Sequence, residues 1–169
     1  MSDLTALPSL AATLAAHGLR ADKRLGQHFL LDANITDRIA RLTGDISGVH
    51  VMEIGPGPGG LTRSLLMCGA KAVTAVEMDS RFLPLLEDVA RVSDNRLTVI
   101  EGDGLKVDPA TLGVTRIAAN LPYNVGTKML TNWLTASPPF WDRLVLMFQK
   151  EVAQRVVARP GDSGYGRLA

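Results

Sequence analysis

Residues 50–62 read HVMEIGPGPGGLT, and the rest of the chain is organised around this stretch. The apolar residues among 51–54 are typical of a short buried strand. Four glycines and two prolines then fill residues 55–60 and end that strand abruptly. From Leu61 onward the apolar residues recur at helical spacing, and Gly69 is expected to end the helix. Strand, glycine turn and helix predict the first half of a βαβ unit with a nucleotide at the turn.

The turn at residues 55–60 is compatible with two kinds of nucleotide ligand. Its glycines fit the G-x-G-x-x-G spacing of dinucleotide sites, and Glu77 follows at about the distance of a ribose-binding acid. However, a pyrophosphate requires backbone N–H donors, and Pro56 and Pro58 have none. Glu53 also places a carboxylate beside the turn, which repels an anion and suits the ammonium and sulfonium groups of S-adenosylmethionine (SAM). The sequence therefore favours SAM over NAD.

The composition is that of one folded domain. The chain has 169 residues, of which 46% are hydrophobic and 21% are charged, and its net charge is +1; this is a globular composition and not a disordered one. Its single cysteine, Cys68, excludes an internal disulfide and is expected to be a small core residue. No apolar run approaches the ~20 residues that span a membrane, and the N-terminus lacks a secretory signal. We therefore expect a cytoplasmic protein. We also expect no metal site, because no residues occur at the spacing of metal ligands.

Strands and helices alternate in the predicted secondary structure, which indicates an α/β fold with a mostly parallel sheet and helices on both faces. Strands are predicted over residues 51–54, 72–76, 97–100, 116–119 and 144–148. Three helices are predicted before the second strand: one over residues 9–17, one from the N-cap Asp32 to near Gly44, and one from Leu61 to Gly69. A fourth begins at Ser80 as its N-cap. A fifth contains the core residues Met129, Leu130, Trp133 and Leu134, and a sixth covers residues 150–159. In such a sheet the ligand lies at the carboxyl ends of the strands.

Polar side chains stand where four of the predicted strands end. Glu77 ends the second strand, where a carboxylate can accept both hydroxyls of a ribose. Asp103 lies between two glycines after the third strand and can accept a hydrogen bond from an adenine amino group. With Glu53 and Asn120, these side chains are expected to line one edge of the sheet.

The tetrad Asn120-Leu121-Pro122-Tyr123 indicates the chemistry. The N6 amine of adenine is a poor nucleophile because its lone pair is delocalised into the ring. The Asn120 side-chain carbonyl and a backbone carbonyl beside Pro122 can hold both N6 hydrogens, which favours a pyramidal nitrogen with its lone pair aimed at a methyl group. Tyr123 offers a ring for stacking a flipped-out base. The rate would then come from positioning and from preorganised dipoles, without a strong base.

With these residues in place, the chain resembles the rRNA adenine N6,N6-dimethyltransferases of the KsgA/RsmA type. The resemblance runs from about Leu25 to the last residue, and its markers are LGQHFL at 25–30, EIGPG at 53–57, Glu77, Asp103, NLPYN at 120–124, FQKEVA at 148–153 and GYGRL at 164–168. It implies a Rossmann-like class I SAM-dependent methyltransferase fold. It also implies methyl transfer from SAM to N6 of two adjacent adenosines near the 3′ end of 16S rRNA during ribosome biogenesis, with S-adenosylhomocysteine (SAH) as product.

The resemblance also implies roles for single residues. His28 and Leu30 would contact SAM, Gly55 would line its methionine pocket, and Asn120 would sit at the methyl-transfer centre. The expected cofactor-binding residues are Gln27, His28, Leu30, Gly55, Gly57, Glu77, Met78, Asp103, Gly104 and Asn120, and the expected catalytic residues are Asn120, Leu121, Pro122 and Tyr123. Residues 1–31 would form an N-terminal helix and a segment that caps the cofactor, and residues 1–169 the catalytic domain. His28 stands where the family often has Asn.

Two alternatives to this function remain open. The chain can be a non-catalytic RNA-binding or ribosome-assembly factor, or a relative of mitochondrial transcription factors, that retains the SAM pocket. An NAD-binding oxidoreductase domain is a weaker alternative because no hydride-transfer constellation is present. The macrolide-resistance relatives usually carry Ile in place of Leu121, which favours the small-subunit enzyme. The implied partners are small-subunit rRNA and the immature small subunit; a monomer without membrane contact is expected.

One departure from the family concerns the C-terminal side. The family's sheet has two further strands after this point and then a small helical domain, and this chain stops before them. Residues 144–148 would then form an exposed, hydrophobic sheet edge, which natural proteins avoid. We therefore expect a truncated chain with a nearly complete SAM pocket.

Overall fold

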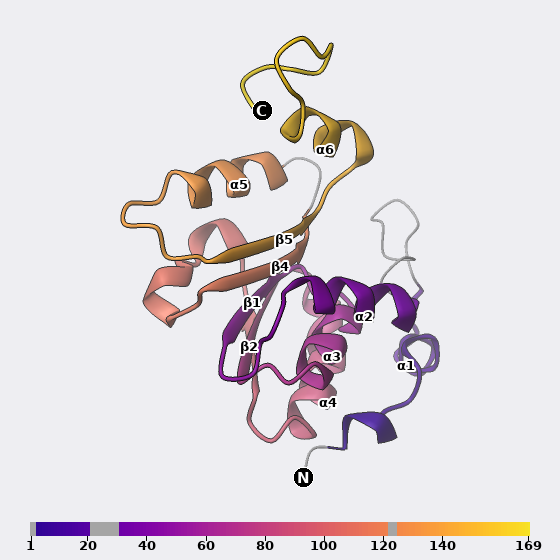
Figure 1. Cartoon of the computed structure of the whole chain (residues 1–169). Helices are drawn as coiled ribbons and strands as arrows, with labels where there is room; N and C mark the ends of the chain where they lie inside the picture. Colours follow the sequence, from indigo (N-terminus) through magenta and orange to yellow (C-terminus); the bar gives the residue numbers. More distant parts are fainter. Residues whose placement is uncertain (1–2, 21–30, 122–124) are drawn as a thin grey trace.

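The sheet has five parallel strands in the order β3-β2-β1-β4-β5 (Figure 1). The computed structural model describes residues 3–20, 31–121 and 125–169. The strands are β1 (His50–Ile54), β2 (Ala72–Glu77), β3 (Leu97–Glu101), β4 (Arg116–Asn120) and β5 (Arg143–Met147). All five predicted strands are present, each within one residue at either end, and the predicted parallel pairing is confirmed.

Helices cover both faces of this sheet (Figure 1). The α-helices are α1 (Leu10–Ala16), α2 (Ala33–Leu42), α3 (Gly60–Met67), α4 (Leu83–Arg91), α5 (Gly126–Leu134) and α6 (Lys150–Val156). Short 3₁₀ helices are η1 (Leu4–Ala6), η4 (Ser80–Phe82), η5 (Gly104–Lys106) and η6 (Pro109–Leu112). Among the helices of the described residues, none is long and apolar enough to cross a membrane.

The central strand β1 is buried on both faces because its side chains alternate between two cores. Val51 belongs to the core beneath α2, α3 and α4, which includes Ile39, Leu65 and Val89. Met52 and Ile54 belong to the second core, beneath α5, with Met129 and Trp133. This double burial explains why the strand appears in the sequence as a nearly continuous apolar run.

Three details of the sequence-based prediction are wrong. Ser80 does not cap α4: the Asp79 side chain accepts from the Arg81 N–H at 3.1 Å and begins η4, which leads into α4. Leu134 is 54% exposed because it is the last residue of α5, so no further turn covers it. Cys68 is exposed as well, since it follows the last residue of α3.

The strand β5 forms one edge of the sheet, as expected from the sequence. Its residues from Leu144 onward are only partly buried. Beyond it, α6 and the C-terminal residues extend away from the sheet in Figure 1. The side of the molecule next to β4 and β5 is therefore less covered than the side next to β1 and β2.

Candidate functional site

The residues predicted to bind a ligand meet at the carboxyl ends of four neighbouring strands. Glu53 and Glu77 lie near the ends of β1 and β2, Asp103 follows β3, and Asn120 ends β4. The strand order reverses between β1 and β4, and this is the point at which open α/β sheets bind ligands.

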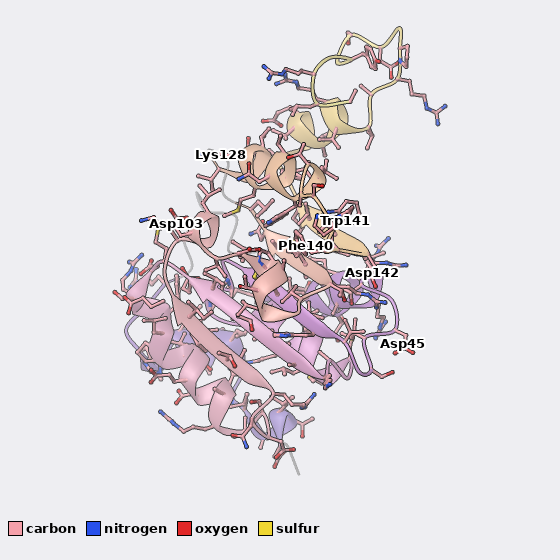
Figure 2. All side chains as sticks on the ribbon, turned by 90° about the vertical axis from the view of Figure 1, so that its left-hand side faces the viewer. Asp45, Asp103, Lys128, Phe140, Trp141 and Asp142 are labelled. Atoms are coloured by element: carbon pink, nitrogen blue, oxygen red, sulfur yellow. The ribbon has the colours of Figure 1, made fainter. Side chains whose placement is uncertain are left out.

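The opposite end of the sheet carries structural contacts. Arg116, the first residue of β4, donates to Asp142 Oδ1 at 2.9 Å and to the Thr43 carbonyl at the end of α2, also at 2.9 Å. Figure 2 shows Asp103 well apart from Asp45 and Asp142, which lie near this amino-terminal end of the strands. The two ends of the sheet therefore differ in composition and in role.

The glycine turn leaves its backbone open on the site side. Gly55, Gly57 and Gly59 have φ values of 69°, 54° and 89°, in the left-handed region that favours glycine. A Cβ built at Gly57 would meet no heavy atom within 4 Å, whereas one at Gly55 would lie 3.6 Å from the Asn120 carbonyl oxygen. A ligand can thus lie against the bare backbone between β1 and β4, as the sequence predicts.

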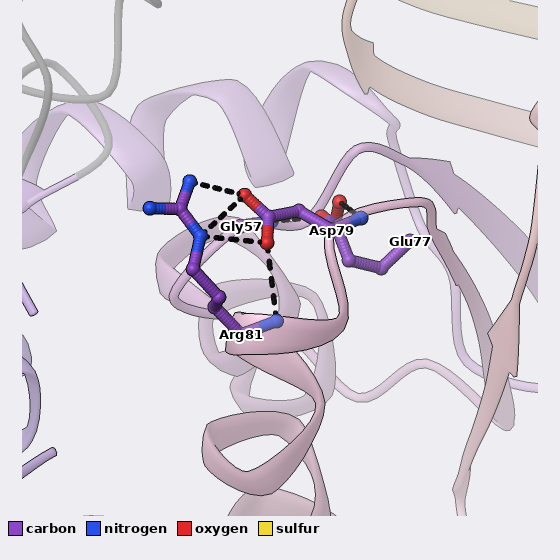
Figure 3. A network of polar contacts seen from close by, with 4 residues as sticks. All are labelled: Gly57, Glu77, Asp79 and Arg81. Atoms are coloured by element: carbon purple, nitrogen blue, oxygen red, sulfur yellow. Dashed lines mark hydrogen bonds and ion pairs between the residues drawn. The ribbon is translucent and has the colours of Figure 1, made fainter.

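Glu77 links the glycine turn to the Asp79–Arg81 pair in the hydrogen-bond network drawn in Figure 3. Its Oε2 accepts from the Gly57 N–H and its Oε1 from the Asp79 N–H, each at 2.8 Å. Asp79 in turn forms an ion pair with Arg81 at 2.6 Å. Because each carboxylate oxygen has two lone pairs, Glu77 can hold the turn against β2 and still accept hydroxyl groups of a ligand.

Glu53 lies deeper than the sequence suggests. The residue is 1% exposed, and the Thr62 hydroxyl donates to its Oε2 at 2.6 Å. Burial raises the pKa of Glu53 to about 8; the Thr62 hydrogen bond opposes this rise, and the charge of Glu77 adds to it. The position of Glu53 in the sequence suggests an open carboxylate, whereas in the structure the group is buried, and burial favours its neutral form.

Asp103 begins the short helix η5 after β3. Its Oδ1 accepts from the Leu105 N–H at 2.9 Å, which fixes the carboxylate at the sheet edge. A Cβ at the neighbouring Gly104 would lie 2.9 Å from Ile54 Cγ2 and 3.0 Å from Met129 Cε, so a larger residue would require these side chains to shift. Met78, another predicted cofactor residue, is 73% exposed.

Asn120 and Leu121 connect the end of β4 to the segment before α5. Asn120 is half-buried, and the Leu121 N–H donates to the Met147 carbonyl at 3.3 Å. A Cβ at Gly126 would lie 3.0 Å from Leu121 Cβ and 3.1 Å from the Phe148 ring, so this glycine permits the close packing of both side chains. Gln27, His28, Leu30, Pro122 and Tyr123 lie outside the described residues.

The described residues also contain a cavity that differs from the predicted site. It has a volume of about 520 Å³ and lies between residues 104–110, the second half of α5 and residues 136–140. It shares only Gly104 with the predicted cofactor residues, and Figure 2 looks onto this side, with Phe140 labelled. No group of three His, Cys, Asp or Glu residues suited to a metal occurs within the described part of the chain.

Comparisons with known proteins agree with this geometry. A family model described as "Ribosomal RNA adenine dimethylase" matches residues 18–169. Two relatives named "Ribosomal RNA small subunit methyltransferase A", from Cereibacter sphaeroides and Dinoroseobacter shibae, are 57% and 58% identical over the whole chain. The chain spans 62% of the length of each.

Solved structures give the same result. A dimethyladenosine transferase from Plasmodium falciparum has a TM-score of 0.71 and 36% identity over 81% of this chain and 49% of its own. The 23S rRNA methyltransferase ErmE has a TM-score of 0.64 and 27% identity over 73% of this chain and 49% of its own. The Rossmann-like methyltransferase fold predicted from the sequence is thus confirmed. Family model, relatives and fold agree that the chain belongs to the ribosomal RNA adenine dimethylase family.

Proposed function

We propose that this chain is the SAM-binding catalytic part of an enzyme that dimethylates N6 of two adjacent adenosines near the 3′ end of small-subunit rRNA. The observation that carries the proposal is the row of polar residues at the carboxyl ends of β1 to β4, around an open glycine turn. Relatives 57% identical and named as small-subunit rRNA methyltransferases support it. Because the chain spans 62% of their length, the activity is proposed for the whole protein.

The described residues fit a ligand with the functional groups of SAM. The carboxyl groups of Glu53 and Glu77 hydrogen-bond to residues of the turn and of the helix that follows it, which suits a ligand ammonium group beside Gly55 and Gly57. Glu77 would accept the ribose hydroxyls and Asp103 the adenine amino group, with Met78 and Gly104 bordering the base. Gln27, His28 and Leu30 would cover the cofactor. SAM, when bound, supplies a methyl group on a positively charged sulfur.

Asn120 is proposed to position the target amine. Its side-chain carbonyl and the backbone carbonyl beside Pro122 would each accept one N6 hydrogen, so the nitrogen lone pair is directed towards the methyl group. Leu121, packed against Phe148 and Gly126, would hold this acceptor in place, and Tyr123 would stack on the flipped-out base. Preorganised acceptors of this kind lower the barrier without moving during the reaction.

The proposed partners are rRNA and the immature small ribosomal subunit, met in the cytoplasm by a monomer. Exposed basic residues near the C-terminal end of the chain support contact with phosphates: Lys150 and Arg155 on α6, and Arg159 after it, are all exposed. Neutralising several phosphates in this way is the main source of affinity for nucleic acid.

Methyl transfer to immature small subunits tests this function. The extended chimera, defined here as residues 1–169 followed by the C-terminal part of the Dinoroseobacter shibae relative, should transfer tritiated methyl groups from SAM to 16S rRNA. Asn120→Ala should lower turnover by about a hundredfold or more, the scale for one preorganised catalytic dipole, and leave SAM affinity within a few fold. The matched control Asn132→Ala changes an exposed residue of α5 and should retain turnover. An Asn120→Ala chimera with unchanged turnover would contradict the catalytic role.

A further inference from the structure

Two carboxyl groups are buried near each other at the proposed cofactor site. Glu53 belongs to β1 and Glu77 ends the neighbouring strand β2, and the two residues are only 1% and 7% exposed. Two like charges that share a low-dielectric setting repel each other, so one of them usually keeps a proton or pairs with a cation. The question is which of the two groups does so.

Their hydrogen bonds distinguish them. Glu77 accepts a main-chain N–H on each oxygen, from Gly57 and from Asp79. The hydrogen bond described for Glu53 joins it to the Thr62 hydroxyl. A hydroxyl can donate to a carboxylate or accept from a neutral carboxyl, so this contact survives a change of protonation. Glu53 is therefore the group that can hold a proton without losing its partner.

The elements packed against Glu53 provide no compensating positive charge within the described residues. Its strand partners on β2 and β4 are alanines. On α3 it contacts Thr62, and the next residue, Arg63, donates instead to the Pro8 carbonyl and to Thr13. The charge that acts on Glu53 is that of Glu77, and together with burial it raises the pKa of Glu53 to about 8.

We infer that Glu53 holds a proton in the free chain and releases it to solvent when the ammonium group at the aminoacyl end of the cofactor binds beside the glycine turn. The inference rests on the proposed function, because it requires SAM or SAH as ligand. A neutral carboxyl avoids an uncompensated buried charge in the free chain. The ligand's ammonium group supplies the compensation on binding, so the neutral Glu53 carboxyl becomes a carboxylate beside an ammonium group and one proton is released to solvent.

Calorimetry on the 169-residue chain tests this exchange. Titration with SAH at about pH 6.5, in two buffers of different ionisation enthalpy, counts the protons released. We expect about one proton for SAH and for SAM, and none for 5′-methylthioadenosine, which lacks the aminoacyl end. SAH affinity should also rise by up to about tenfold per pH unit between about pH 5.5 and 7, below the range in which the ligand's amino group titrates.

The variant Glu53→Gln tests whether the released proton comes from Glu53. Its neutral amide resembles the protonated carboxyl, so the variant should fold and bind SAH with no proton release and no pH slope from this position. The matched control Glu101→Gln changes the exposed residue that pairs with Glu77 on β3 and should keep both effects. A second measurement needs no variant: the infrared band of a protonated buried carboxyl should be present in the free chain and disappear with SAH.

The outcomes separate the inference from the proposed function. SAH binding without proton release, or a pH slope that persists in Glu53→Gln and thus comes from a histidine, would overturn the inference and leave the proposed function standing. Failure of both SAM and SAH to bind would contradict the proposed function and the inference together. An infrared band unaffected by bound SAH would overturn the inference alone.

Discussion

Glu77 holds the glycine turn against β2 through the Gly57 N–H, and the same carboxylate is the proposed ribose acceptor. Replacing it removes both contacts. We expect Glu77→Ala to weaken SAM binding by about 1–3 kcal/mol, the range for leaving buried partners unpaired, as measured by calorimetry on the 169-residue chain. The matched control Glu101→Ala removes an exposed carboxylate from the paired position of β3 and should bind SAM normally. Equal affinities of the two variants would show that Glu77 does not contact the cofactor.

The raised pKa of Glu53 makes the stability of the folded chain depend on pH. Burial, opposed by Thr62 and assisted by Glu77, raises its pKa in the folded chain to about 8 from 4.5. Between these values the folded chain keeps the proton and the unfolded chain does not, so the stability contributed by Glu53 is complete below about pH 4.5 and is lost as the pH rises towards 8. Glu53→Gln should therefore gain free energy of unfolding relative to the wild type, by up to about 1.4 kcal/mol per pH unit.

Urea unfolding of both proteins at about pH 5.5 and 7.5 measures this difference. Glu101→Gln, at an exposed position, serves as the control and should follow the wild type at both pH values. A difference between Glu53→Gln and the wild type that does not change with pH would mean that Glu53 is ionised in the folded chain.

The sequence predicts which polar residues lie at the site, but it does not predict their protonation or their hydrogen-bond partners. Glu77 and Asp103 were placed at strand ends because the strands themselves were recognisable from their apolar residues. The proton on Glu53 and the bond from the Gly57 N–H to Glu77 were not predicted, because they depend on groups brought together by folding. Local patterns contain no information on which distant donor a carboxylate will meet.

The turn after β3 offers a test at the level of an element. A Cβ at Gly104 would lie 2.9 Å from Ile54 Cγ2 and 3.0 Å from Met129 Cε, whereas one at Gly102 would meet nothing within 4 Å. We therefore expect Gly104→Ala to lower the free energy of unfolding by about 1–3 kcal/mol, the usual cost of overpacking. Gly102→Ala, two residues away in the same turn, should stay within about 0.5 kcal/mol of the wild type. Similar losses in both variants would indicate that general turn flexibility, and not packing against Ile54, sets the requirement.

Most elements were predictable because their signals are local. The N-cap of α2 at Asp32 is confirmed, because the Asn34 N–H donates to Asp32 Oδ1 at 2.9 Å. The errors at Ser80 and Leu134 occur at helix ends. There, the cap that forms and the side chain that stays covered depend on where the chain leaves the helix, which periodicity does not reveal.

At the scale of the whole molecule, the sheet order brings the proposed cofactor residues together. Those within the described part of the chain lie on β2 and β4 or in the turns that follow β1, β2 and β3, while β5 at the edge supplies none of them. The resemblance predicted the family, which the comparisons confirm over residues 18–169. The packing of α6 could not be predicted from its sequence, because two valines one turn apart, Val152 and Val156, do not determine which neighbour a seven-residue helix contacts.

The cofactor pocket and the RNA-binding surface are expected to depend on different parts of the whole protein. The proposed cofactor residues within the described part of the chain lie on β2 and β4 or in the turns that follow β1, β2 and β3, so residues 1–169 alone should bind SAM as the extended chimera does. Affinity for RNA grows with the number of phosphates neutralised, and the chain spans 62% of the length of its curated relatives. We therefore expect residues 1–169 to bind SAM with little or no methyl transfer to immature small subunits, measured with tritiated SAM at low and moderate salt. Methylation by residues 1–169 equal to that of the chimera would show that the RNA-binding surface lies within this chain.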